Sequence, residues 1–255
     1  MRANSRANMR AVLGLMLLGG LLTAVPACAE DAPICDVPAY LLTSESSLPK
    51  VAAAVKSGQK LEILVVGSRS STINTSDGTA YPGRLQAILG EKLSPVAVNV
   101  SVDLQIKKTA EEVAAVLGKL ADGKKPTLVV WQTGTVDAMR SIDPDDFRSA
   151  VDEGVAALQN AGTDVILMNL QYSPRTETMI SAVPYLDHMR VVAQQHDVPL
   201  FDRFAIMRHW NESGDFDLFS ASHGLELAKR VHDCLGRALS KFVIDAAHLA
   251  PAQQN

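Results

Sequence analysis

The sequence predicts an α/β fold in which a parallel five-stranded sheet lies between two layers of helices. Three observations predict it. Short β-branched and aliphatic runs recur along the chain, segments with helical spacing of apolar residues separate them, and no repeat or linker interrupts the series. Strands that alternate with such helices form βαβ units, whose sheets are buried on both faces. The chain has 255 residues, 47% of them apolar and 20% charged, which is enough for a large core. We therefore expect one domain over residues 30–255.

Each element follows from a local signal. The strands are predicted at residues 61–66, 96–102, 127–131, 164–168 and 199–201. The helices are predicted at residues 81–93, 109–120, 143–160, 176–196, 204–210 and 225–244. Gly67 closes the first strand, and Asp122-Gly123 is expected to break the second helix. Pro144 suits the first turn of the third helix. Pro184 is expected to kink or break the fourth.

A parallel sheet of this kind binds ligands at the carboxyl ends of its strands. The loops at that edge are residues 67–80, 100–108, 132–139 and 171–177, together with the loop before the last helix. Candidate functional residues are therefore sought in these segments.

The first 29 residues resemble a bacterial secretory signal peptide. Arg2, Arg6 and Arg10 precede an apolar run at 11–25, and Ala27-Cys28-Ala29 fits an Ala-x-Ala cleavage pattern. The run of about 15 residues is short for a membrane span of roughly 20. Cleavage after Ala29 and a periplasmic or secreted location are expected, with no membrane span. Two alternatives stay open, namely an uncleaved anchor helix and a lipid anchor at Cys28.

Two further cysteines, Cys35 and Cys234, remain in the exported chain. Thiols in an oxidising compartment tend to pair. We predict a disulfide that joins the mature N-terminus to a C-terminal helix. The alternative is two buried free thiols.

Charge and spacing exclude several functions. The net charge is −4 and no basic tract occurs, which argues against nucleic-acid binding. No Cys-x-x-Cys or His-Glu-x-x-His spacing appears, so neither a metal nor a cofactor is expected.

Four stretches carry a resemblance to a known family: residues 66–72 (Val-Gly-Ser-Arg-Ser-Ser-Thr), 81–85 (Tyr-Pro-Gly-Arg-Leu), 131–135 (Trp-Gln-Thr-Gly-Thr) and 207–210 (Met-Arg-His-Trp). They are similar to the blocks of a secreted bacterial subgroup of the SGNH/GDSL hydrolases. The resemblance implies a flavodoxin-like sheet and activity on acyl or acetyl esters of carbohydrates and lipids. It also implies a serine nucleophile, a histidine base held by an aspartate, and oxyanion donors that include a glycine N–H and an asparagine side chain.

This sequence departs from the family pattern at each of those positions. Read without a gap, the nucleophile position holds Arg69, and a one-residue insertion there would instead offer Ser70. The glycine block falls around Asn99-Val100-Ser101 and holds no glycine, and the oxyanion asparagine is replaced by Val136, which donates no hydrogen bond. The resemblance therefore implies a degenerate oxyanion site.

The base and its partner are altered as well. The final family block aligns with 223–226, which places Glu226 at the base position and His223 at the partner position. A carboxylate with an ordinary pKa is a poor base for a serine hydroxyl. If activity survives, we expect Ser70 (or Ser71) to work with His223 and with Asp217 or Asp215.

Ser68, Arg69 and Gly134 are candidate ligand-binding residues, because an arginine, a hydroxyl and backbone N–H groups suit an anion. The alternative for Arg69 is a salt bridge to Glu226 or Asp137. The leading hypothesis is a non-catalytic binding or accessory protein of the cell envelope, with a small acylated, glycan or anionic ligand or an envelope protein as partner. The rivals are an active esterase or deacylase and a purely structural partner.

Overall fold

A parallel sheet forms the centre of the computed structural model, which describes residues 35–73, 78–219 and 224–249. Its strands are β1 (Leu61–Gly67), β2 (Val98–Leu104), β3 (Leu128–Gln132), β4 (Asp164–Met168) and β5 (Leu200–Phe201). They lie in the order β2-β1-β3-β4-β5, and every neighbouring pair is parallel. This is the flavodoxin-like order, in which the direction of strand addition reverses between β1 and β3. The predicted fold class is confirmed.

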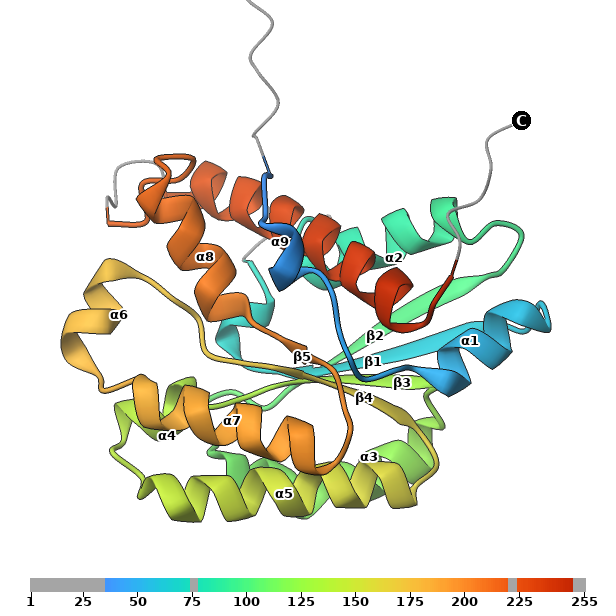
Figure 1. Cartoon of the computed structure of the whole chain (residues 1–255), viewed down its shortest axis with the longest axis horizontal. Helices are drawn as coiled ribbons and strands as arrows, with labels where there is room; N and C mark the ends of the chain where they lie inside the picture. The colour runs from blue at the N-terminus through green and yellow to red at the C-terminus, as the bar shows by residue number, and fades with distance from the viewer. Residues whose placement is uncertain (1–34, 74–77, 220–223, 250–255) are drawn as a thin grey trace, which may run out of the picture. The chain divides into compact units, whose positions relative to one another are not determined.

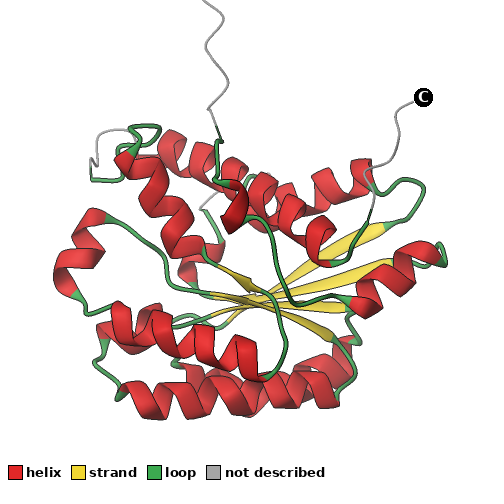
Figure 2. Ribbon diagram, in the orientation of Figure 1, coloured by secondary structure: helices red, strands yellow, loops and turns green. Residues whose placement is uncertain are grey.

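Helices cover both faces of the sheet (Figures 1 and 2). One face carries α2 (Tyr81–Lys92) and α9 (Gly224–Ala246), and the other carries α3 (Ala110–Lys124), α5 (Pro144–Asn160) and α7 (Val183–Gln195). Every residue of β3 and β4 is buried, as expected for strands covered on both sides. The β2 strand is at the edge and is only partly buried.

Two helix boundaries differ from the sequence prediction. The break expected at Asp122-Gly123 is wrong, because α3 continues to Lys124 and ends where Lys125 takes φ 46. A glycine costs a helix only about 1 kcal/mol relative to alanine, which is too little to end it. The segment predicted at 176–196 begins at Pro174 and forms two helices, α6 (Pro174–Met179) and α7. The break expected at Pro184 is confirmed, since Pro184 lies in the first turn of α7. A helix is also added before β1. This helix, α1 (Pro49–Lys56), has its first amides bound by Asp164 of β4, whose Oδ2 accepts from Lys50 N at 2.8 Å and from Val51 N at 2.9 Å.

Two short elements at the carboxyl edge of the sheet were not expected. The 3-10 helix η2 (Arg69–Ser71) directly follows β1, and α4 (Thr135–Met139) follows β3. Gly134 precedes α4 with φ 95, and a Cβ there would lie 2.5 Å from Leu170 Cδ1, so the turn requires glycine. A further 3-10 helix, η1 (Ala39–Leu41), lies near the start of the described chain, and α8 (Arg203–Glu212) follows β5.

The predicted disulfide is confirmed. Cys35 and Cys234 are bonded, and Cys234 is buried in α9. The segment from 44 to 48 follows the same helix, because Leu48 N donates to Ala246 O at 2.9 Å and Ser44 N donates to Asp245 Oδ2 at 3.0 Å. The predicted signal peptide and Cys28 lie outside the described residues. Within the described part of the chain, no helix is both long and apolar enough to cross a bilayer.

Candidate functional site

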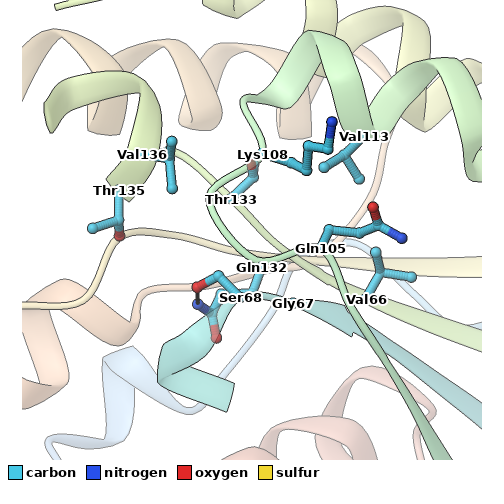
Figure 3. A pocket seen from close by; sticks show the side chains of 11 residues that line it. Val66, Gly67, Ser68, Gln105, Lys108, Val113, Gln132, Thr133, Thr135 and Val136 are labelled. Atoms are coloured by element: carbon cyan, nitrogen blue, oxygen red, sulfur yellow. Dashed lines mark hydrogen bonds between the residues drawn. The ribbon is translucent and has the colours of Figure 1, made fainter. Parts of the chain in front are cut away.

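A cleft of about 780 Å³ lies at the carboxyl end of β1, beside the point where the strand order reverses. It is lined by residues of η2, α4 and two loops: Ser68, Arg69, Ser70, Ile106, Lys107, Thr135, Val136, Met139, Arg140 and Gln171. A cavity of about 10 Å³ adjoins it and shares Ser68, Thr135 and Val136 (Figure 3). That volume is about enough for one water molecule. Open α/β sheets place their ligands at this position.

Gln132, the last residue of β3, organises the floor of the cleft. Its Nε2 donates to Ser68 Oγ at 3.2 Å, the bond drawn in Figure 3, and to Ser70 Oγ at 2.7 Å. Its Oε1 accepts from Ser71 Oγ at 2.8 Å and from the Tyr81 hydroxyl at 3.3 Å. The side-chain amide of Gln132 therefore binds four hydroxyl groups, those of Ser68, Ser70, Ser71 and Tyr81. Gly67 permits this arrangement, since a Cβ there would clash with Ser71 Oγ.

Arg203 is a buried cation directly behind Ser70. Its side chain belongs to the first residue of α8 and is 1% exposed. Nη1 donates to Ser70 Oγ and Nη2 to Ser70 O, both at 3.2 Å, and the guanidinium lies 5.9 Å from the centre of the Tyr81 ring. Burial lowers the pKa of Arg203 to about 10, so the group stays charged at neutral pH. Among the described residues, no carboxylate forms an ion pair with it.

His232 of α9 contacts Tyr81, the residue whose hydroxyl is bound to Gln132. Its Nδ1 accepts from Tyr81 N at 3.0 Å, and the two rings stack with centroids 5.8 Å apart. Burial, and then the charge of Arg203, lower the pKa of His232 to about 3. The imidazole is therefore neutral at physiological pH. It helps to position Tyr81 and does not line the cleft.

The structure brings most of the predicted site residues together. Ser68, Arg69, Ser70 and Val136 all line the cleft, and Gly134 lines the small cavity beside it. Arg69 is exposed at the start of η2, and Ser70 Oγ lies deeper, against Gln132 and Arg203. Ser71, the alternative to Ser70, is buried and bonded to Gln132.

Ser101 does not belong to this group. It lies inside β2 opposite Leu64, and its Oγ is 3.5 Å from Ile63 O, well before the end of the strand. The β2 residue opposite Gly67 is Leu104, so the loop that faces the cleft is 105–108. In that loop Lys107 has φ 62, a conformation that favours glycine. Ser101 therefore does not line the cleft, whereas Lys107 does.

The two carboxylates proposed as partners of Arg69 differ in their surroundings, and Asp137 Oδ2 has no hydrogen-bond partner among the described residues. Glu226 is exposed and pairs with Lys229 at 3.1 Å, and Asp137 is buried with Oδ1 accepting from Ala110 N at 2.8 Å. Burial raises the pKa of Asp137.

The predicted triad is described only in part. Asp217 Oδ1 accepts from Phe219 N at 3.1 Å, and Asp215 Oδ2 accepts from Ser213 Oγ at 3.0 Å. His223 lies outside the described residues, so its pairing with Ser70 and Asp217 stays a prediction.

The sequence did not identify the residues whose hydrogen bonds hold Ser70 and its neighbours in place. His232 was assigned only to a helix, Tyr81 to a helix and a family block, and Gln132 only to a family block. Arg203 fell between the strand predicted at 199–201 and the helix predicted at 204–210. Arg203 and Ser70 are separated by 133 positions in the chain, so no local pattern connects them. The one available signal was an arginine two residues after a predicted strand, at the edge where ligands bind. Within the described ranges, no group of three or more His, Cys, Asp or Glu side chains is arranged to hold a metal ion.

Comparison with known proteins agrees with this geometry. The model of the Non-GDSL lipase-like family matches residues 34–249. A lipase/acylhydrolase from Enterococcus faecalis is 18% identical with a TM-score of 0.59, over 76% of this chain and 100% of that one. An acetylxylan esterase from Geobacillus stearothermophilus is 16% identical with a TM-score of 0.57, over 77% and 98%. A psychrotrophic esterase from Pseudoalteromonas sp. is 16% identical with a TM-score of 0.54, over 71% and 97%. A comparison with curated proteins gives no match. At these identities the structures share the SGNH/GDSL hydrolase fold, and the family match over most of the chain shows that this protein belongs to the Non-GDSL lipase-like family.

Proposed function

We propose that this chain is an exported, non-catalytic member of its family that binds a ligand in the cleft, as a binding or accessory protein of the cell envelope. The observation that carries the proposal is the state of Ser70 Oγ. It accepts N–H groups from Gln132 at 2.7 Å and from Arg203 at 3.2 Å. A hydroxyl oxygen has two lone pairs. Both are engaged, so neither is free to attack a carbonyl carbon.

Two further residues support the loss of catalytic activity. Val136 occupies the wall of the cleft where the resemblance implies an asparagine donor, and removal of one oxyanion donor typically costs about 10²–10³ in rate. Arg69 occupies the ungapped nucleophile position and lines the same cleft. The Cys35–Cys234 disulfide supports export, because such bonds persist mainly in oxidising compartments.

The experiment measures hydrolysis of p-nitrophenyl acetate and p-nitrophenyl butyrate by the purified chain. Ser70→Ala is compared with Ser149→Ala, an exposed serine of α5, and circular dichroism verifies folding. We expect the three proteins to give the same background rate, and no labelling by a fluorophosphonate probe. Turnover or labelling that is lost in Ser70→Ala and kept in Ser149→Ala would refute the proposal.

An active esterase or deacylase is the second candidate, and one observation favours it. Ser70 lines the cleft, and the buried Arg203 points a charged N–H at its Oγ, which stabilises negative charge on that oxygen. Ser70 would then act with His223 and Asp217 on an acyl or acetyl ester, the class named for the similar structures. Fluorophosphonate labelling that disappears in both Ser70→Ala and His223→Ala is the result that this candidate requires.

A further inference from the structure

The hydroxyl group of Ser68, which lines the cleft, is placed to donate a hydrogen bond to a ligand. Ser70 Oγ already accepts two N–H groups, so its own hydrogen goes to Ser68 Oγ, 3.3 Å away. Ser68 Oγ then accepts from Ser70 and, at 3.2 Å, from Gln132. Both of its lone pairs are filled as well. Among the described residues, the remaining O–H, on Ser68, has no hydrogen-bond acceptor, so a ligand in the cleft can supply one.

Among the described residues, the charged side chains that line the cleft are all positive. Arg69, Lys107 and Arg140 line the cleft, and none of its lining residues is acidic. The buried Arg203 adds a fourth positive charge behind Ser70. Glu112 offsets a part of this charge, with its carboxylate 3.7 Å from Arg140. The excess is local, since the whole chain carries a net charge of −4. A concave cationic site of this kind concentrates anions.

The other wall of the cleft is apolar. Ile106 is 43% exposed and Met139 is 62% exposed, and Val136 lies in the same lining. These side chains come from the 105–108 loop and from α4, next to Lys107 and Arg140. A cleft of about 780 Å³ is far larger than a lone carboxylate or phosphate group and falls within the ordinary range for small-molecule sites.

We infer that the cleft binds an anionic amphiphile, a carboxylate or phosphate head group attached to an apolar chain. The head group accepts from Ser68 Oγ and lies among Arg69, Lys107 and Arg140, while the chain lies on Ile106 and Met139. This inference rests on the proposed function, because it assigns the ligand class of the same non-catalytic cleft.

The test is calorimetric titration of the purified chain with five compounds below their micelle concentrations. They are dodecanoate, dodecyl phosphate, dodecanol, acetate and inorganic phosphate. We expect saturable binding of dodecanoate or dodecyl phosphate, and at least tenfold weaker binding of the other three. The comparison of the two anions distinguishes a carboxylate from a phosphate head group. The inference is overturned if neither anion binds, or if dodecanol binds equally well.

Two pairs of variants locate the site. Lys107→Gln is compared with Lys125→Gln, because both lysines are exposed and have positive φ, and only Lys107 lines the cleft. We expect Lys107→Gln to weaken binding of the anion roughly twofold to fivefold, as for an exposed charge pair, and Lys125→Gln to leave it unchanged.

Met139→Gln is compared with Met179→Gln, an exposed methionine of α6 outside the cleft lining. The first should cost roughly fivefold for dodecanoate and the second nothing. Equal effects within either pair would overturn the placement.

The experiments distinguish a wrong ligand class from a wrong proposed function. Ester turnover that depends on Ser70 refutes the non-catalytic proposal, whatever the titrations give. Absence of anion binding by a chain that also lacks turnover refutes only the ligand class.

Discussion

Acid should destabilise this protein through His232, a residue that no cleft ligand touches. In the folded chain Nδ1 accepts from Tyr81 N at 3.0 Å, and the ring lies near the buried cation of Arg203. Protonation would break that hydrogen bond and place a second positive charge in the same interior. His232→Asn is a suitable perturbation, since Asn Oδ1 takes about the place of Nδ1 and does not titrate.

The size of the effect follows from the two pKa values of this group. The folded pKa is about 3 and the ordinary value is 6.5. Between these values the unfolded state binds a proton that the folded state excludes, so stability falls as the pH falls through this range. One proton changes the free energy of unfolding by about 1.4 kcal/mol per pH unit. Because the unfolded histidine is only half protonated at pH 6.5, wild type should therefore lose roughly 2 kcal/mol more than His232→Asn between pH 6.5 and pH 4.5.

Urea unfolding at pH 4.5, 5.5, 6.5 and 7.5 measures this, with the fluorescence of the buried Trp131 and Trp210 as the signal. The difference in unfolding free energy between wild type and variant should be constant at or above pH 7 and should change steadily below pH 6.5. Parallel curves down to pH 4.5 would refute the reasoning. The imidazole resonances of His232 should also show no titration above pH 4.5 in the folded protein.

Two further predictions concern stability. Cys35→Ser or Cys234→Ser should lower the free energy of unfolding by about 2–5 kcal/mol, because the bond closes a loop across 199 positions, and a reducing agent should lower wild type by the same amount. Gly154→Ala should cost about 1–3 kcal/mol in urea unfolding, since a Cβ there would clash with the Trp131 ring, whereas Gly118→Ala, with 3.8 Å to its nearest neighbour, should not destabilise. Equal results for the two glycines would contradict the packing argument.

The central strands could be predicted because their signal is local. Leu61–Gly67 and Asp164–Met168 are apolar runs that only a sheet covered on both faces can bury. Helix ends were less predictable, because they depend on distant partners. The first amides of α1, for example, are bound by Asp164, more than a hundred positions away.

The residues of the candidate site could likewise be predicted where their signal is local, and not where they depend on distant segments. Its lining could be predicted, since Ser68, Arg69 and Val136 follow strands whose carboxyl ends meet at one edge. Its support could not be predicted, since the Gln132 amide and the Arg203 guanidinium reach Ser70 from segments that only the fold brings together. The position of Ser101 also depended on strand register, and a register cannot be read from one strand alone.

The Cys35–Cys234 bond has a consequence for the order of events during synthesis of the chain. Cys35 meets its partner only after 199 further positions have been synthesised, because Cys234 lies near the middle of α9. No earlier cysteine of the described chain competes for it. An oxidised pair therefore marks a chain that has been synthesised at least as far as Cys234 in α9.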